Sequence, residues 1–389
     1  MQVTFVSNYI NHHQIPVSDE LYAHLGEKYH FVQTEPMEEE RIKMGWGAEV
    51  KNLPYLVCYY EKPELCRKLI MESDVVIFGG VEDESYIAPR LEKGLFTVRY
   101  SERIYKEGQW KMVSPRGLLK KYHDHIRYRK SDVYMLCAGA YVADDFRLIG
   151  AYPEKMLKWG YFPKNHKYDI EELFAKKSKN EVPLLLWTGR MIDWKHPEYA
   201  IELAKRLKEK GYAFGLKMIG GGEMKPQLEC IVKELGLEKE VTFLDFMSPA
   251  DVRSQMEKAD IYLMTSDRKE GWGAVVNEAM NSGCVVVGSH MVGAVPTLIC
   301  HGVNGLVFQS ENMDSLTQEV EKIINNACYR KKIGTAAYET IDTIWNPQNA
   351  ARRLLEFCRT KNAEVYKEGP CMREIPVREN RMYQKIKEN

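Results

Sequence analysis

The sequence predicts an α/β fold made of two doubly wound domains, each a parallel sheet covered by helices on both faces. Short apolar runs of strand length alternate with segments of helical apolar spacing along the whole chain. The run at 184–188 (LLLWT) is continuously apolar, as expected of a strand that is buried on both faces. The length of 389 residues exceeds one ordinary hydrophobic core and suits two.

Each domain is expected to contain one series of strands and helices. The expected strands of the first half are residues 3–6, 31–33, 55–58, 75–78, 96–99 and 133–136. The helices between them are expected at 16–25, 63–71, 84–92, 115–127 and 139–149. The expected strands of the second half are 184–188, 216–219, 241–244, 261–264, 284–287 and 306–308. The first two helices of this half are predicted from apolar residues at helical spacing. These residues are Ala200, Leu203, Ala204 and Leu207 in the first helix, and Leu228, Ile231, Val232 and Leu235 in the second.

A polar, charged segment at 164–182 separates the two series and marks the domain boundary. We expect an N-terminal domain over residues 1–165 and a C-terminal domain over 166–340. The end of the chain, about 340–389, is expected either as a helix packed back on the first domain or as a loosely ordered tail. Ligands of doubly wound sheets bind beyond the carboxyl ends of the strands. We therefore expect the site in the loops that follow strands, along a cleft between the domains.

The composition is that of a soluble globular protein, with 44% apolar and 28% charged residues. Lysine plus arginine equals aspartate plus glutamate, 55 of each, which argues against nucleic-acid binding. The nine cysteines are scattered without metal-ligand spacing, a pattern typical of buried, reduced thiols in a cytoplasm. The first residues (MQVTFVSNYINHH) predict no signal peptide, and no apolar run reaches transmembrane length.

The strongest candidate site runs from Glu270 to Glu278 (EGWGAVVNE), after the expected strand 261–264. Gly271 and Gly273 allow a ligand to approach the backbone closely. They flank an expected helix start, whose unpaired N–H groups suit phosphate or sugar oxygens. Glu278 is expected about two turns into that helix, so the two carboxylates can accept hydrogen bonds from different hydroxyls of one long ligand. The plain alternative is a helix-dipole partner and a solvated glutamate.

Two further loops after strands contribute candidates. Arg190 and Lys195 are five residues apart after the first strand of the second domain, where two fixed cations can neutralise a diphosphate leaving group. Two surface cations near a turn are the alternative. Gly221 is the middle of three glycines that end the strand 216–219, where the chain can either pass close to a nucleotide or simply turn. Asp144 and Asp145 fall in a helix pattern that predicts a surface position, so we expect no metal site.

Taken in order along the chain, these motifs resemble those of retaining glycosyltransferases of family 4. The resemblance covers about residues 183–330. Its motifs are Gly189-Arg190 with Lys195, IGGG at 219–222, VTFL at 241–244, EGWG at 270–273 with EAM at 278–280, GCVV at 283–286 and GLV at 305–307. The resemblance implies the GT-B fold, in which two Rossmann-like domains face each other across a cleft. It also implies transfer of a hexose-type sugar from a nucleotide-diphosphate sugar, with UDP-sugars as the first expectation, with retention and without metal or other cofactor.

The resemblance also implies roles for single residues. Arg190 and Lys195 would bind the donor diphosphate, Glu270 hydroxyls of the transferred sugar, and Glu278 the donor ribose. The nucleotide base would rest against the backbone near Leu244–Met247, with Phe246 among the donor-binding residues. The backbone N–H groups for the sugar and the distal phosphate would come from Gly271, Trp272, Gly273 and Ala274. Trp272 stands where the family usually has Phe, and we expect its bulk to shape the sugar pocket.

The first half is similar to the family in architecture only. Family members often carry a His near the reacting sugar, where this chain has Ser101 and Glu102. Glu102 is therefore the expected catalytic substitute. The polar loop after the first strand is expected to contact donor or acceptor through Asn8, His12 and His13, although either histidine also suits a capped turn.

The acceptor is left open by the sequence, as a glycan, a lipid-linked sugar or a small molecule, with polysaccharide biosynthesis as the expected setting. The segment from Ser114 to Lys130 is basic, with Tyr, Leu and Ile between the charges. It suits peripheral contact with an anionic inner membrane surface that carries a lipid-linked acceptor. A solvated basic helix face is the alternative.

Two other classes of function are compatible with the same fold. One is a nucleotide-sugar 2-epimerase or a sugar phosphorylase, and the other is a non-catalytic nucleotide-sugar-binding protein. The pair of glutamates together with Arg190 and Lys195 favours transfer over both.

Overall fold

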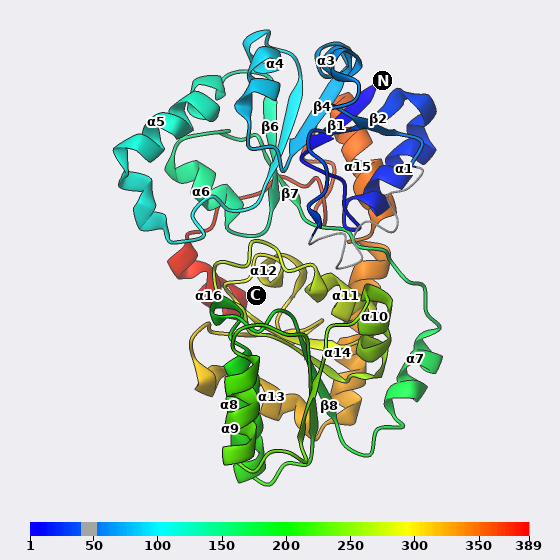
Figure 1. Cartoon of the computed structure of the whole chain (residues 1–389), viewed down its shortest axis with the longest axis vertical. Coiled ribbons are helices and arrows are strands. Elements are labelled where there is room, and N and C mark those ends of the chain that lie inside the picture. The colour runs from blue at the N-terminus through cyan, green and yellow to red at the C-terminus, as the bar shows by residue number, and fades with distance from the viewer. Residues whose placement is uncertain (40–52, 389) are drawn as a thin grey trace. The chain divides into compact units, whose positions relative to one another are not determined.

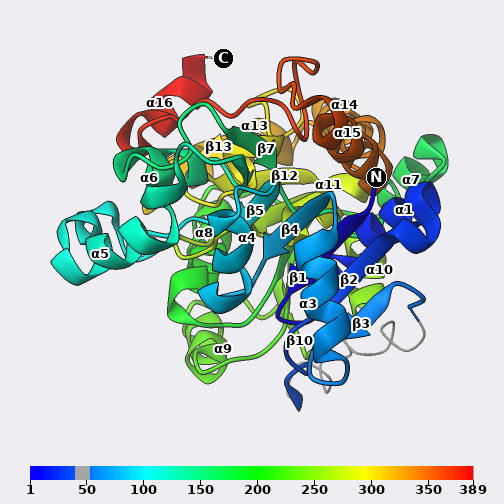
Figure 2. The same ribbon diagram turned by 90° about the horizontal axis from the view of Figure 1, so that it is seen from above.

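The computed structural model describes residues 1–39 and 53–388, which divide into two compact units. Unit 1 comprises Met1–Lys164 together with Ile344–Glu379. Unit 2 comprises Asn165–Thr343 together with the C-terminal residues from Asn380. Each unit is a parallel sheet with helices between its strands, and each is described by itself below (Figures 1 and 2).

Unit 1 contains a seven-stranded parallel sheet in the order β3-β2-β1-β4-β5-β6-β7. The strands are β1 (Val3–Ser7), β2 (Tyr29–Gln33), β3 (Leu56–Cys58), β4 (Val75–Gly79), β5 (Thr97–Ser101), β6 (Val133–Ala138) and β7 (Met156–Trp159). Every residue of β1 and β4 is buried, as expected for central parallel strands with a covered face on each side.

The helices of unit 1 come from both ends of the chain. They are α1 (Ile15–Leu25), α3 (Pro63–Glu72), α4 (Ala88–Glu92), α5 (Pro115–Asp124), α6 (Val142–Leu148) and α15 (Pro347–Thr360). α15 packs against α1, and Gln348 of α15 donates a hydrogen bond of 2.5 Å to Glu20 of α1, 328 residues earlier (Figure 1). Asn346 caps the start of α15, because its side chain accepts a hydrogen bond from the Asn349 N–H.

Unit 2 contains a six-stranded parallel sheet in the order β10-β9-β8-β11-β12-β13. Its strands are β8 (Leu184–Thr188), β9 (Gly215–Ile219), β10 (Val241–Leu244), β11 (Ile261–Met264), β12 (Val285–Ser289) and β13 (Leu306–Phe308). Its helices are α7 (Ile170–Lys177), α8 (Pro197–Glu209), α9 (Lys225–Glu234), α10 (Pro249–Lys258), α11 (Val275–Asn281), α12 (Val295–Leu298), α13 (Met313–Ile324), α14 (Ala327–Thr343) and, from Asn380 on, α16 (Glu379–Glu388). The apolar faces of α8 and α13 pack with the strands in one continuous apolar core.

The order of strands reverses once in each sheet, and this reversal positions the loops that matter for function. In unit 1 it lies between β1 and β4, and in unit 2 between β8 and β11. Adjacent loops diverge to opposite faces at such a point, which leaves a crevice beyond the carboxyl ends of the strands. The loops after β8 and β11 carry Lys195 and Glu270, so the candidate residues of unit 2 lie where a doubly wound sheet binds its ligand.

The expected strands are all present, but the structure adds one and alters several helices. β7 was not predicted, because it is a four-residue edge strand with Lys158 inside it. The helix expected at 84–92 is broken into a 3₁₀ turn at Glu84–Tyr86 and the short helix α4, with Pro89 in the first turn of α4. The helix expected at 139–149 is shorter, as α6. Cysteines are free throughout the described residues, and the expectation of burial fails for the exposed Cys230, Cys300 and Cys328.

The prediction that Asp144 and Asp145 lie on the surface is wrong. Both are at most 1% exposed, in the first turn of α6. Asp145 accepts a hydrogen bond from the Tyr105 N–H (3.1 Å) and lies 3.4 Å from Arg103, whose guanidinium also contacts Glu379 at 2.7 Å. Burial raises the pKa of Asp145, and the charge of Arg103 opposes that rise. The two aspartates are structural anchors of unit 1.

Candidate functional site

An ion pair between Lys195 and Glu270 lies at the strand-order reversal of unit 2. The Lys195 ammonium is 2.5 Å from Glu270 Oε2, and the Ser266 hydroxyl donates to the same oxygen at 3.1 Å. Only 17% and 15% of the two charged side chains are exposed, so the pair is mostly shielded from water. The structure therefore brings together a cation and a carboxylate that are 75 residues apart in the sequence.

The loop that carries Lys195 is fixed by hydrogen bonds to the sheet. The Trp187 indole donates to the Thr265 hydroxyl (2.8 Å), and that hydroxyl donates to the Lys195 carbonyl (2.7 Å). The ammonium also lies 4.6 Å from the centre of the Trp194 ring, within reach of a cation–π interaction. Arg190, in the same loop, is exposed. One cation is thus held in place, and the other can reorient toward a ligand.

Glu278 lies in the first turn of α11, because this helix begins at Val275. The expectation that Glu278 lies two turns into the helix, with the helix starting near Gly271, is wrong: residues 271–274 form a loop ahead of a short helix. Glu278 Oε1 is 3.6 Å from the guanidinium of Arg253 on α10. Burial raises the pKa of Glu278, and Arg253 opposes that rise.

Tyr262 on β11 is buried at the strand-order reversal of unit 2. Its hydroxyl lies 2.8 Å from that of Thr188 at the end of β8. Burial raises the pKa of this phenol, the Thr188 bond lowers it, and the charges of Glu278 and Glu270 raise it again. The hydroxyls of Tyr262 and Thr188 therefore form a hydrogen-bonded pair at the reversal point. Tyr262 and Arg253 were not predicted from the sequence, because one resembles any strand residue and the other any helix cation.

Trp272 does not line a pocket as expected. Its side chain is fully buried, and the indole donates a hydrogen bond of 2.9 Å to Asn277. Gly273 beside it has φ +90°, and an added Cβ would lie 2.9 Å from Met264 and 3.0 Å from Val292. The loop thus requires glycine at this position, and the buried, hydrogen-bonded Trp272 anchors it to the first turn of α11.

The three glycines after β9 are explained mainly by their contact with the loop after β8. A Cβ on Gly220 (φ +131°) would lie 2.0 Å from the Gly189 carbonyl oxygen, and a Cβ on Gly222 would lie 2.4 Å from that of Met191. Gly221, in contrast, has open space around its Cα and accepts a hydrogen bond from the Met191 N–H. Of the three, only Gly221 has room beside it for a ligand. Phe246, after β10, is 60% exposed, which suits an aromatic stacking surface.

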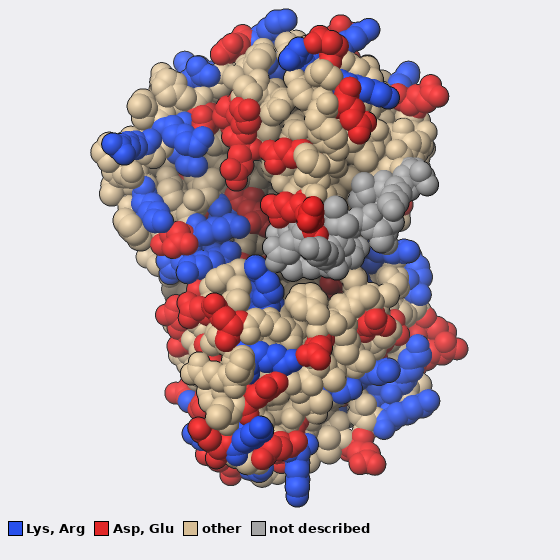
Figure 3. Space-filling view, viewed as in Figure 1, with Lys and Arg blue, Asp and Glu red and all other residues tan. Residues whose placement is uncertain are grey.

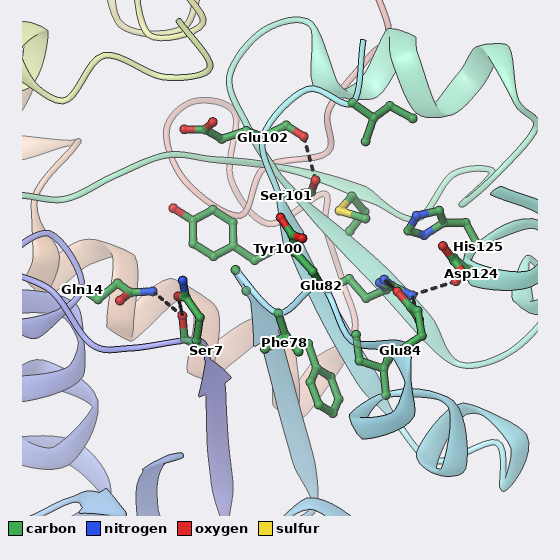
Figure 4. A pocket seen from close by; sticks show the side chains of 18 of the residues that line it. Ser7, Gln14, Phe78, Glu82, Glu84, Tyr100, Ser101, Glu102, Asp124 and His125 are labelled. Carbon is green, nitrogen blue, oxygen red and sulfur yellow. Dashed lines mark hydrogen bonds and ion pairs between the residues drawn. The ribbon is translucent and has the colours of Figure 1, made fainter. Parts of the chain in front are cut away.

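Unit 1 contains a cavity of about 670 Å³ beyond the carboxyl ends of β1, β4 and β5. Figure 4 shows Ser7 and Gln14 on one side of it and Glu84, Asp124 and His125 on the other. Four of the predicted residues line this cavity: Asn8, His13, Ser101 and Glu102. His12 does not line it, and instead its ring lies 3.8 Å from that of His13.

Glu102 in this cavity is held by two partners. Its Oε2 is 2.5 Å from the Lys106 ammonium, and its Oε1 accepts a hydrogen bond of 2.7 Å from the Tyr161 hydroxyl. The Tyr161 ring also stacks on that of His13, at 5.8 Å between centres. Burial lowers the pKa of His13 well below its usual range, and the neighbouring His12 lowers it further, so His13 is neutral near pH 7.

Several charged groups of the cavity were not predicted. Arg99 on β5 forms an ion pair with Glu84 and donates to the Asp124 carbonyl at 2.7 Å. His125 beside them has its pKa lowered to about 2 by burial and by the charge of Arg99. Lys120 and Lys121 of α5 also line the cavity. A strand arginine and a helix terminus carry no motif, so only the fold brings these groups together.

Within residues 1–39 and 53–388, no three His, Cys, Asp or Glu side chains are grouped as metal ligands would be. Among the helices of the same residues, none is both long and apolar enough to cross a membrane.

The second half of the chain is similar to known proteins. Residues 169–340 match the family described as Glycosyl transferases group 1. Alpha-D-kanosaminyltransferase of Streptomyces kanamyceticus is 27% identical over 197 residues, 51% of this chain and 48% of that protein. The amylovoran biosynthesis glycosyltransferase of Erwinia amylovora is 28% identical over 178 residues, 44% of each chain. The chain thus matches about half the length of these curated relatives.

Solved structures match nearly the whole chain. HepE of Anabaena, crystallised with UDP, has a TM-score of 0.69 at 16% identity and covers 92% of this chain and 100% of its own. A glycosyltransferase from Rickettsia africae has a TM-score of 0.67 at 18% identity and covers 92% of this chain and 97% of its own. At this identity the likeness concerns the fold, and it confirms the predicted two-domain α/β architecture of the GT-B type.

Proposed function

We propose, from the match of residues 169–340 to glycosyl transferases group 1, that the protein transfers a sugar from a nucleoside-diphosphate sugar to an acceptor hydroxyl. The observation that carries the proposal is the shielded Lys195–Glu270 pair at the strand-order reversal of unit 2. UDP-sugars are the first candidates, because a structural neighbour was crystallised with UDP.

The ion pair prepares both groups for a donor. In the absence of donor, each charge compensates the other, so neither is left unpaired in a mostly buried site. A bound donor offers a diphosphate to Lys195 and sugar hydroxyls to Glu270. The contact between the two side chains is then replaced by one contact from each of them to the donor. Arg190 would turn to the diphosphate, Glu278 would accept from the ribose, and the exposed ring of Phe246 would support the base. Backbone N–H groups of residues 271–274 would bind the sugar and the distal phosphate.

The proposed transfer retains the anomeric configuration and needs no metal. The bond between the anomeric carbon and the distal phosphate oxygen breaks, and the acceptor oxygen bonds to that carbon on the same face. The acceptor proton passes to the departing phosphate oxygen, so no side chain acts as nucleophile. Lys195 and Arg190 stabilise the charge on the leaving diphosphate, which is the largest electrostatic change in the reaction.

We place the acceptor in the cavity of unit 1, whose volume of about 670 Å³ suits one or two sugar rings. Glu102 is proposed to orient the acceptor, since Lys106 and Tyr161 hold both of its oxygens. Its full set of partners argues for a positioning role. We further propose that the reaction takes place in the cytoplasm, with a glycan or a lipid-linked sugar as acceptor.

The test combines a donor screen with replacement of Glu270. Wild-type protein is incubated with UDP-, GDP- and ADP-sugars, and free nucleotide, epimerised donor and sugar phosphate are each measured. We expect nucleotide release, with a rate that falls by roughly 10²–10³-fold in Glu270→Ala. Glu321→Ala, which breaks the exposed Lys210–Glu321 pair (2.6 Å) of the same unit, is the matched control and should keep full activity. Normal turnover in Glu270→Ala would refute the assignment.

Two details of the proposal have their own tests. Anomeric proton couplings of the product, measured by NMR, distinguish retention from inversion. Turnover in the presence of EDTA should equal that in its absence; complete loss that manganese restores would contradict metal-independent transfer. An epimerised donor would instead identify a nucleotide-sugar 2-epimerase, and a sugar phosphate would identify a sugar phosphorylase.

A further inference from the structure

Exposed apolar side chains gather on one short segment of unit 1. Five large apolar residues with at least 40% exposure lie between residues 110 and 122: Trp110, Val113, Leu118, Leu119 and Tyr122. Three of them are more than half exposed, with Trp110 at 71% and Val113 at 72%. Clusters of this kind on a protein surface indicate a site that contacts a protein, a ligand or a membrane.

Helix α5 carries the centre of this cluster and does not serve the core of unit 1. None of its residues is buried, and its flanking 3₁₀ turns are its main neighbours. In both views it lies at the edge of its unit (Figures 1 and 2). A core-covering helix of a doubly wound domain buries an apolar stripe. Here the apolar stripe of Leu118, Leu119 and Tyr122 faces solvent instead.

The same segment is strongly basic. Residues 109–130 contain seven lysine and arginine residues and one aspartate, in a chain whose total charges balance. Lys111, Arg116, Arg129 and Lys130 are exposed, and no residue that the structure describes forms an ion pair with them. Figure 3 shows lysine and arginine side chains gathered over the part of unit 1 where α5 lies in Figure 1. Exposed apolar side chains surrounded by cations match the headgroup region of an anionic bilayer.

We propose that residues 110–130 dock this protein on an anionic lipid bilayer. The apolar side chains enter the headgroup region, and the surrounding lysine and arginine side chains bind lipid phosphates. The charge is what selects a bilayer over a second copy of the chain, because two such surfaces would repel each other. Each basic side chain near an anionic surface is expected to strengthen binding by roughly fivefold.

The docking surface lies one helix away from the cavity of unit 1. Lys120 and Asp124 line that cavity from the face of α5 opposite to Leu118 and Tyr122, as helical spacing requires. A bilayer in contact with the outer face of α5 is therefore about 10–12 Å from the cavity wall, the diameter of a helix. Resting on the proposed transferase function, this geometry points to an acceptor whose sugar or phosphate head extends from a membrane lipid into the cavity.

The test is co-sedimentation of the full chain with vesicles, which requires neither donor nor turnover. We expect binding to vesicles of phosphatidylglycerol and phosphatidylcholine in equal amounts, weaker binding at 0.5 M salt, and little binding to phosphatidylcholine alone. The variant Leu118→Gln/Leu119→Gln/Tyr122→Ser should bind at least about tenfold more weakly. Leu65→Gln/Ile375→Gln, at two exposed apolar positions of the same unit outside this segment, should bind as wild type does.

Three outcomes would overturn the proposal: no binding of wild type to the anionic vesicles, equal binding of the triple variant, or equal loss in the control variant. Sedimentation equilibrium without lipid tests the other occupant. If the triple variant converts a dimer into a monomer while vesicle binding is unchanged, the surface is an interface between copies. Nucleotide-sugar turnover is measured separately, so the docking surface and the transferase function can fail independently.

Discussion

Replacing Lys195 by methionine tests the proposed donor site most directly. The change keeps the length and apolar stem of the side chain and removes only the ammonium that lies 2.5 Å from Glu270. Of the side chains that the structure describes around Glu270, the Ser266 hydroxyl at 3.1 Å then remains as its hydrogen-bond partner. The variant therefore leaves a mostly buried carboxylate with a single neutral donor.

The magnitude for stability follows from the burial of the pair. Exposed pairs contribute about 0.5 kcal/mol, whereas breaking a fully buried one costs about 4 kcal/mol. With 17% and 15% of the side chains exposed and Ser266 in place, we expect a loss of about 2 kcal/mol in the free energy of unfolding of unit 2. For catalysis, the lost stabilisation of the leaving diphosphate should lower kcat by roughly 10²–10³-fold.

Urea denaturation followed by circular dichroism measures the first effect, and release of nucleotide from the donor measures the second. Lys210→Met is the matched control, because it breaks the exposed pair with Glu321 in the same unit. It should lower stability by less than about 1 kcal/mol and leave turnover unchanged. If Lys195→Met lowers stability but keeps kcat within about threefold, the pair is structural and the proposed role of Lys195 in leaving-group stabilisation is wrong.

Three further predictions concern backbone packing, a buried charge and a titrating carboxylate. Gly220→Ala should lower the free energy of unfolding by at least about 2 kcal/mol, because its Cβ would lie 2.0 Å from a carbonyl oxygen at a positive φ. Gly221→Ala, the control in the same urea titration, should change it by less than about 1 kcal/mol. Arg103→Met should cost about 3–5 kcal/mol by thermal denaturation, because it leaves Asp145 buried without its cation; a change below about 1 kcal/mol would contradict the buried network. UDP affinity, measured by calorimetry, should fall as the pH falls through the raised pKa of Glu278, because the protonated acid accepts ribose hydrogen bonds poorly. Glu278→Gln should remove that pH dependence. An unchanged pH profile in this variant would contradict the assignment.

The sheet strands could be predicted because parallel strands buried on both faces are written as continuous apolar runs. β8 and β11, at the centre of the second sheet, have the predicted bounds. β7 could not be predicted in this way, because Lys158 interrupts a strand of only four residues. Helix ends were predicted less accurately than strands. α11 begins later than expected, because Gly273 and the buried Trp272 shape the loop before it.

The candidate site divides in the same manner. Lys195 and Glu270 were predicted to serve one ligand, since loops after neighbouring strands meet at one edge of the sheet. The charged groups of the unit 1 cavity were not predicted, because no motif in the sequence indicates that Arg99 and Glu84 pair. Only the fold brings these two side chains together. Asp145 shows the converse error: two adjacent aspartates in a helix pattern suggest solvent, yet Arg103, 42 residues earlier, makes burial possible.

The packing of α15 on α1 has a consequence for how the chain is made. α1 presents Ile15, Val17 and Leu21 to a unit whose closing helix is synthesised more than 300 residues later. At a ribosomal rate of about 5–20 residues per second, that interval is roughly 15–65 s. Unit 2 can close almost entirely during this time, since all but its last ten residues precede Ile344. The first unit to emerge is therefore completed only after nearly all of unit 2 has been made, and until then the surface that α15 will cover stays available to chaperones and to other nascent chains.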